Sequence, residues 1–193
     1  MLYDNTFDYH VDLCGFILET IDNNETVDYI VTDANPTDIC RHFSDEEIIK
    51  ISNGISFIDC FSAHYGFDDK VLKHKKKQLS EKGITIYEAR TFSEIHSASN
   101  DSWYRFRKKL RKKEENTFRI PHRTVYDTLS SLIDYSSQEV YLTYLRHVIA
   151  SERSYGMISI ILEPNTLDKN LKDKLSRITD IVLDFQSRSN KRI

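Results

Sequence analysis

Four acidic residues stand at or near the ends of apolar stretches that have the composition of β-strands. They are Asp33, Asp59, Asp127 and Glu163. Ligands of open α/β sheets gather at the carboxyl ends of the strands, where a carboxylate can hold a metal ion or act as a general base. Carboxylates at strand ends also cap helices and stabilise turns, and the sequence leaves both roles open.

The remaining residue types that could do chemistry show no spacing typical of a site. The seven histidines form no HxH or HExxH pattern, and they are His10, His42, His64, His74, His96, His122 and His147. No GxSxG motif surrounds Ser62, Ser130 or Ser131, and the three cysteines, Cys14, Cys40 and Cys60, form no CxxC pair. We therefore expect no metal site and no hydrolase, and we predict reduced, mostly buried thiols.

Two runs of cations are the strongest surface signal in the sequence. The first comprises Lys70, Lys73, Lys75, Lys76 and Lys77. The second comprises Arg105, Arg107, Lys108, Lys109, Arg111, Lys112 and Lys113, and its aromatic neighbours are Trp103, Tyr104 and Phe106. Aromatic rings beside clustered cations suit the binding of single-stranded nucleic acid. A solvated helix face, or a surface that meets an acidic partner, explains the same pattern.

The elements that must position these residues are read from the hydrophobic pattern. Apolar, β-rich stretches cover 27–34, 55–62, 84–89, 123–129, 156–164 and 178–185. Segments with a three-to-four-residue apolar period lie between them, among them the stripe of Leu13, Phe16, Ile17 and Ile21. This alternation predicts an α/β fold with a mainly parallel sheet and helices on both faces. We expect one domain over 1–193, with a basic excursion from the sheet at about 97–123.

Composition limits the function classes further. The chain has 193 residues, of which 39% are hydrophobic and 30% charged, which fits one domain with a sizeable core. No stretch approaches the roughly 18 consecutive apolar residues of a membrane-spanning helix. The amino terminus also lacks the basic and apolar regions of a signal peptide, so we expect a cytoplasmic protein. The net charge of −3 gives no overall attraction for nucleic acid.

Four stretches together resemble the RecA-like ATPases of the KaiC and archaeal RadA-related group. "VDYIVTDANPTDICRHF" (27–43) is similar to the family's second strand and the helix after it, and "FIDCFS" (57–62) to the next strand. "RTVYDTLSSLIDYSS" (123–137) resembles the Walker B strand, and 156–185 resembles the closing strands and helix. The order and spacing of the four stretches carry this resemblance, which implies a RecA-like fold over nearly the whole chain.

The resemblance places the phosphate-binding loop on residues 4–11, "DNTFDYHV", where every chemical requirement of that loop has failed. Asp4 and Tyr9 stand where glycines would let backbone N–H groups turn toward the phosphates. His10 stands in place of the lysine and supplies only a partial charge near neutral pH. Val11 replaces the hydroxyl residue that binds magnesium, so the loop is degenerate.

A second functional feature of the family is missing after the second strand. The family has an acidic pair there, one member of which polarises the attacking water, whereas this chain has Asp33 followed by Ala34. Asp127 alone matches the Walker B carboxylate, and the resemblance therefore implies a vestigial nucleotide site in a pseudo-ATPase.

Three functions follow as hypotheses, and for the first of them we expect no cofactor. The first is a regulatory or scaffolding domain without catalysis, which contacts a protein partner or a second copy of itself. The second is a nucleic-acid-binding accessory protein of the recombinase type that uses residues 103–113. The third is an unorthodox nucleotide-binding protein or ATPase that uses Asp127 and the strand ends.

Overall fold

Six parallel strands form the centre of the computed structural model. It describes residues 2–3, 9–65, 69–111, 121–128, 131–133, 136–155, 158–164 and 168–177. The strands lie in the order β1-β6-β5-β2-β3-β4, and every neighbouring pair is parallel. They are β1 (Leu2–Tyr3), β2 (Thr26–Val31), β3 (Ile55–Asp59), β4 (Thr85–Glu88), β5 (His122–Asp127) and β6 (Ile158–Pro164). The strand expected at 178–185 lies outside the described residues.

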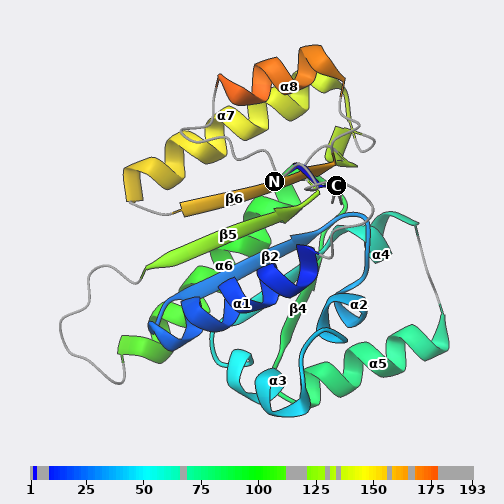
Figure 1. Ribbon diagram of the computed structural model, residues 1–193, viewed down its shortest axis with the longest axis vertical. Helices are drawn as coiled ribbons and strands as arrows, with labels where there is room; N and C mark the ends of the chain where they lie inside the picture. Colours follow the sequence, from blue (N-terminus) through cyan, green and yellow to red (C-terminus); the bar gives the residue numbers. More distant parts are fainter. Residues whose placement is uncertain are drawn as a thin grey trace, which may run out of the picture.

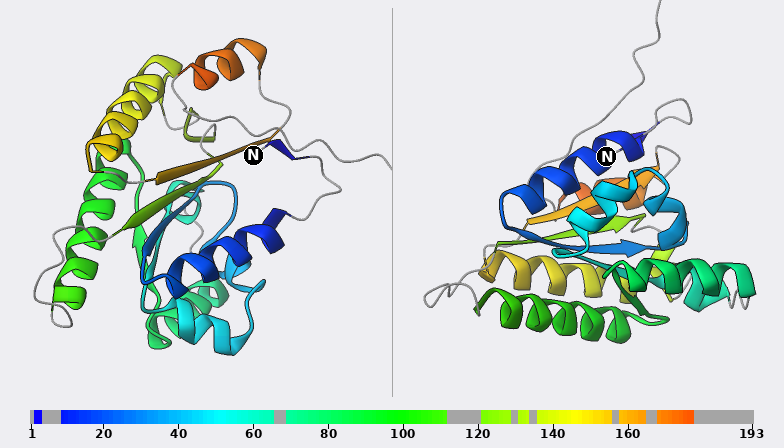
Figure 2. Two further views of the ribbon diagram at one scale, coloured as in Figure 1. Left: turned by 60° about the vertical axis from the view of Figure 1, so that its left-hand side comes forward. Right: turned by 90° about the horizontal axis from the view of Figure 1, so that it is seen from below.

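Helices cover both faces of this sheet (Figures 1 and 2). Those of the first half are α1 (Tyr9–Asp22), α2 (Pro36–Cys40), α3 (Asp45–Ile51), α4 (Cys60–Tyr65) and α5 (Lys70–Glu81). Those of the second half are α6 (Phe92–Arg111), α7 (Gln138–Tyr155) and α8 (Lys169–Ser176). The predicted α/β class is confirmed, because the parallel sheet with helices on both faces is consistent with a RecA-like α/β fold. No helix in the described ranges is both long and apolar enough to cross a membrane.

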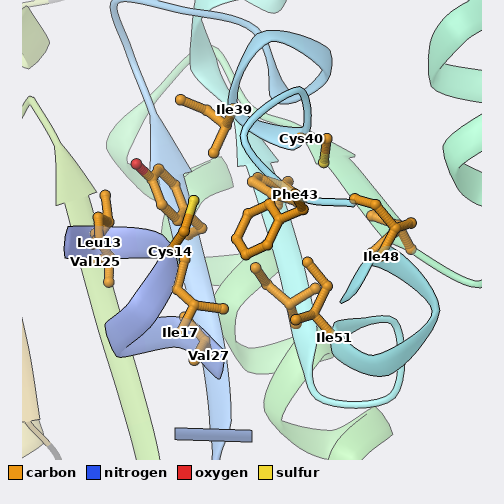
Figure 3. Close-up of a cluster of buried hydrophobic side chains, with 14 of the residues drawn as sticks. Leu13, Cys14, Ile17, Val27, Ile39, Cys40, Phe43, Ile48, Ile51 and Val125 are labelled. Carbon is orange, nitrogen blue, oxygen red and sulfur yellow. The ribbon is translucent and has the colours of Figure 1, made fainter. Parts of the chain in front are cut away.

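Two hydrophobic cores lie on opposite faces of the sheet. Alternate residues of β2 divide between them: Val27, Tyr29 and Val31 pack under α1, whereas Ile30 packs under α6 and α7. Figure 3 shows the first core, in which side chains from α1, α2 and α3 meet β2 and β5. Burial on both faces explains why the strands read as nearly continuous apolar runs rather than as alternating patterns.

The three cysteines are buried and form no disulfide, as the sequence predicts. Burial raises the pKa of the Cys40 thiol to about 12, and the neighbouring Cys14 acts in the same direction. Burial also raises the pKa of Cys60, with the charge of Asp59 adding to it. Both thiols are therefore protonated at neutral pH, and a protonated buried thiol packs as a small apolar group.

Local sequence signals fix the start of the helices that follow β2. Asn35 caps α2, because its side-chain oxygen accepts from the N–H groups of Thr37 at 3.0 Å and Asp38 at 3.2 Å. Pro36 takes the first helical position, where a missing N–H costs nothing. A capping box between Ser44 and Glu47 starts α3. Asn35 therefore starts α2 soon after β2 ends, and the capping box starts α3 after α2.

The first part of the basic segment at 97–123 is helical. Residues 97–111 continue α6, which packs on β2, β3 and β4. The buried positions of this helix are Ile95, Ala98, Ser102 and Phe106, each at most 6% exposed. Their helical spacing marks the inner face, and the dense run of cations begins at Arg105, at the end of that stripe. Residues 112–120 lie outside the described part.

Candidate functional site

The order in which the chain adds strands to the sheet reverses between β2 and β5. From β2 the chain continues through β3 to β4 on one side, and α6 then returns it to β5 on the other side of β2. Ligands of open α/β sheets bind outside the carboxyl ends of the strands at such a switch point. Thr32 and Asp33 follow β2 there, and Asp127 ends β5 with Thr128 after it, so Asp33 and Asp127 both lie at the switch point.

The polar groups at the switch point are bonded to one another. The Tyr29 hydroxyl donates to Asp127 Oδ2 at 2.7 Å, and the Asp127 side chain is buried. The Thr32 hydroxyl donates to the Thr128 carbonyl at 2.7 Å and accepts from the Thr128 N–H at 2.7 Å. These bonds extend the β2–β5 pairing beyond the last backbone pair, Val31 and Asp127.

Asp33 joins the same cluster from the surface. The Thr128 hydroxyl donates to Asp33 Oδ2 at 2.6 Å and lies 2.8 Å from the Ser131 hydroxyl. Asp33 is exposed, whereas Thr128 is buried. The arrangement therefore tethers an accessible carboxylate to the end of β5, which is a structural use of a residue that could otherwise activate a water.

The other vestigial positions are described only in part. Helix α1 begins at Tyr9, so Tyr9, His10 and Val11 form its first turn. The side chains of these three residues, and all of Asp4, lie outside the described part. Strand β1 precedes this segment at the edge of the sheet, where it pairs with β6.

The acidic residue at the end of β3 has a structural role. Asp59 is fully buried, accepts from the Ser62 N–H at 2.8 Å at the start of α4, and pairs with Lys76 Nζ at 2.6 Å. Lys76 also contacts Glu88 Oε1 at 3.0 Å, so this cation of the first basic run points inward. Burial lowers the pKa of Lys76, but its hydrogen bonds and ion pairs with Asp59 and Glu88 outweigh burial and raise the pKa overall.

A buried polar network on the face of the sheet covered by α6 was not predicted from the sequence. The Ser102 hydroxyl donates to Asp28 Oδ1 at 2.5 Å, and His122 Nε2 lies 3.2 Å from Asp28 Oδ2. His122 Nδ1 lies 2.8 Å from the Thr26 hydroxyl. Asp28 stands inside an apolar strand that is buried on both faces, and this position is the signal that could have revealed a buried carboxylate.

Arg105 completes that network instead of contributing to a basic surface. Its Nη2 donates to the Ser56 hydroxyl at 2.8 Å and to the Ile55 carbonyl at 3.3 Å. Ser56 lies 2.8 Å from Ser102, so two hydroxyls link the guanidinium to the Asp28 carboxylate. Burial lowers the pKa of Arg105, while Tyr87 and Asp28 act against it. The guanidinium thus stabilises the docking of α6.

The rest of the predicted basic surface is described unevenly. The Arg107 guanidinium lies 5.0 Å from the centre of the Trp103 ring, which is a cation–π distance. Lys108 is exposed, whereas the side chains of Lys109 and Arg111 lie outside the described part, as do Lys112 and Lys113. Among the described cations of this run, Lys108 therefore faces solvent while Arg105 does not.

A groove beside the switch point was not predicted. A cavity of about 230 Å³ lies between α2, α4 and α5, and its apolar lining includes Phe61, Val71 and Leu72. Polar residues from the three helices complete it, namely Asn35, Thr37, Asp38, Arg41, Asp69 and Lys75. Val71 is 58% exposed beside this groove, and the 54% exposed Tyr65 packs against Phe61 with ring centres 5.1 Å apart.

Comparison with known proteins assigns no relatives. No protein-family model matches the chain, and no curated protein matches it. Within the described ranges, no group of three or more His, Cys, Asp or Glu side chains could hold a metal ion.

Proposed function

We propose that this chain is a RecA/KaiC-like domain without ATP binding or hydrolysis, which acts as a regulatory or scaffolding protein through protein contacts. The observation that supports this is the closed polar cluster at the switch point. Tyr29 engages the buried Asp127 carboxylate, and Thr128 engages both Asp33 and Ser131. Because these polar groups hydrogen-bond to one another, their arrangement differs from one that binds a phosphate-bound magnesium ion. The sequence of residues 4–11 adds neither a glycine nor a lysine.

A thermal-shift titration tests the loss of nucleotide binding. We expect no rise in Tm when ATP, ADP or GTP is added with magnesium, because stabilisation follows only from binding to the folded state. A ligand at a hundred times its Kd would stabilise the fold by about 2.7 kcal/mol, which such a titration detects easily.

A double variant, His10→Lys with Val11→Thr, is the matched control, since it restores the missing cation and hydroxyl. It should also fail to bind, because Asp4 and Tyr9 still occupy the glycine positions. Stabilisation of the wild type by any of these nucleotides would contradict the proposal and favour the unorthodox nucleotide-binding alternative.

The groove between α2, α4 and α5 supports the choice of protein contacts. Aromatic and aliphatic side chains at its centre with charged residues at its rim are the anatomy of protein interfaces. Phe61, Val71 and Leu72 supply the apolar lining, and the exposed Tyr65 packs against Phe61 beside it. Arg41 and Asp69 are charged residues of the same lining. The groove adjoins the carboxyl ends of β2 and β3. The family that the chain resembles stacks its subunits at the nucleotide seam, so this edge suits a contact with a second copy.

Sedimentation velocity over a range of concentrations tests that contact. We expect reversible self-association that weakens in the double variant Tyr65→Glu with Val71→Glu, because two charges would then be placed in an apolar interface. Ile49→Glu is the matched control, since Ile49 is 60% exposed on α3 and does not line the groove. A monomer at every concentration, or equal weakening by the control, would contradict self-association through this groove.

A further inference from the structure

A second cavity lies between α6 and α7, on the face of the sheet opposite α1. Its volume is about 160 Å³. Asn100 and Trp103 of α6 form one wall, and Tyr144 and Val148 of α7 form the other. His122 and Thr124 of β5 contribute the floor. Figure 2 shows the two helices side by side over the sheet, so the cavity is a slot between neighbouring helices. The groove and the switch-point cluster do not share its lining residues.

The lining combines aromatic rings with uncharged hydrogen-bonding groups. Trp103 and Tyr144 present ring surface, while Ser99, Asn100 and Thr124 present hydroxyl and amide groups. No Asp, Glu, Lys or Arg occurs among the described residues that line this cavity. Each ring already packs on a neighbour: Tyr144 stacks on Phe92 with ring centres 4.5 Å apart, and the Arg107 guanidinium packs over Trp103. The remaining ring surface favours contact with a flat ligand, and the scattered donors and acceptors favour polar groups on the edge of that ligand. Apart from the two imidazoles, His96 and His122, this lining offers a charged ligand no ion-pair partner, so the desolvation of a charge is poorly compensated.

The floor of the cavity is held in one orientation by the buried polar network. His122 is 5% exposed, and its two ring nitrogens lie within hydrogen-bond distance of Thr26 and Asp28. The imidazole is therefore fixed and adds flat surface, while the hydroxyl of Thr124 and the amide of Asn100 remain as polar groups of the lining. On the wall, the Arg107 guanidinium packs over the Trp103 ring. Walls that are fixed before binding reduce the entropic cost of binding a small ligand.

We propose that this cavity binds a small, uncharged, planar ring with hydrogen-bonding groups on its edge, of the size of a pyrimidine base. A cavity of roughly 150 Å³ accommodates a benzene-sized molecule, so the volume fits a single six-membered ring with small substituents. The sugar and phosphates of a nucleotide exceed this volume, and the lining offers no cation to a phosphate. The proposal does not depend on the loss of ATP binding, because it concerns different residues on the other face of the sheet.

The fluorescence of Trp103 provides a direct test. Trp103 is the only tryptophan in the chain, so its emission reports the wall of this cavity alone. The full-length protein would be titrated with uracil and cytosine as the probes, with orotate as a charged pyrimidine and toluene as a ring without polar groups. We expect a saturable change in emission with a neutral pyrimidine, a weaker change with toluene and none with orotate.

Two other results would overturn the proposal. One is the absence of a saturable change with either neutral pyrimidine, and the other is a preference for orotate or toluene. A change that rises linearly without saturation is collisional quenching and also counts against binding.

Variants on α6 locate the ligand. Ser99→Leu should abolish the saturable change, because the larger side chain occupies the cavity. Ser97→Leu is the matched control on the exposed face of the same helix and should bind as the wild type does. Asn100→Ala removes a polar group without filling the space, so it should weaken pyrimidine binding even if Ser99→Leu does not fold. Unchanged affinity in a folded Ser99→Leu or in Asn100→Ala would show that the ligand binds elsewhere.

Discussion

The Asp28→Ala variant is expected to lose about 3–5 kcal/mol of unfolding free energy, because removing one member of a buried charged network strands the others. Asp28 is fully buried and accepts from Ser102, and it lies beside His122 Nε2. Alanine would leave His122 Nε2 without the Asp28 carboxylate and Ser102 with its Ser56 contact, in a buried layer. It would also remove the carboxylate that the Arg105 guanidinium faces through two hydroxyls. Urea denaturation followed by circular dichroism measures the loss as a lower midpoint with an unchanged slope.

Asp101→Ala is the matched control for this prediction. Asp101 is an exposed carboxylate on the same helix as Ser102, so its removal should change the unfolding free energy by no more than about 0.5 kcal/mol. Asp28→Asn keeps the shape and one acceptor oxygen, and we expect a loss between those of the other two variants. A loss below about 1 kcal/mol for Asp28→Ala would contradict a dry network, because neutral exposed hydrogen bonds contribute only that much.

The fold follows from the sequence because its signals are repeated along the chain. Each apolar stretch is bounded by turn residues and followed by a helical period, so the alternation predicts the parallel sheet even where single boundaries shift. Thus β2 ends at Val31 and β3 at Asp59, earlier than the predicted stretches 27–34 and 55–62. The strands are shorter than predicted because a helix begins soon after each of them. Asn35 caps α2 after β2, and the Asp59 carboxylate accepts from the Ser62 N–H at the start of α4.

The direction of individual charged side chains could not be predicted in the same way. Lys76 and Lys77 are neighbours in one run of lysines, yet the Lys76 side chain is 14% exposed and that of Lys77 75% exposed. Arg105 likewise belongs to a cation run but points to Ser56. Both depend on acceptors brought from distant strands, and neither local composition nor helical period contains that information.

The candidate site was likewise predictable only in part: the positions of its residues follow from the sequence, but their contacts do not. The sequence shows Asp33 and Asp127 at the ends of apolar stretches, and in the structure they lie at the carboxyl ends of the neighbouring strands β2 and β5. Their bonds to Thr128 and Tyr29 needed the register of β2 against β5, which the sequence does not specify. The family assignment itself remains a proposal that rests on the order of the resembling stretches.

The Lys76→Met variant is expected to lose about 3 kcal/mol of unfolding free energy, since it leaves a buried carboxylate without its cation. Methionine keeps most of the apolar stem of the side chain but cannot pair with Asp59, which is fully buried and keeps only the Ser62 N–H at 2.8 Å. Lys77→Met removes the same charge from an adjacent position. Its 3.8 Å contact with Glu81 is exposed, so we expect a change within about 0.5 kcal/mol. Equal losses in the two variants would contradict the buried pair.

The difference between wild type and Lys76→Met should also depend on pH in one direction. Because the pKa of Lys76 is raised above its ordinary value of 10.5 in the folded protein, its pairing contributes fully at pH values below 10.5. That contribution is lost as the pH rises through the folded-state pKa, so urea midpoints of the two proteins should converge only in strong alkali. Convergence nearer neutral pH would mean that Lys76 is not held by Asp59 and Glu88.

Lys76 also connects stability with the proposed protein contact. Helix α5 contains the inward-pointing Lys76 and also Val71 and Leu72, which line the groove. Its N-cap residue, Asp69, belongs to the same lining. The ion pair with Asp59 ties this helix to the carboxyl end of β3, beside Phe61 of α4. Lys76→Met should therefore weaken self-association together with stability, whereas Tyr65→Glu with Val71→Glu should weaken association alone. A Lys76→Met protein that is destabilised but associates normally would show that the groove does not depend on this anchor.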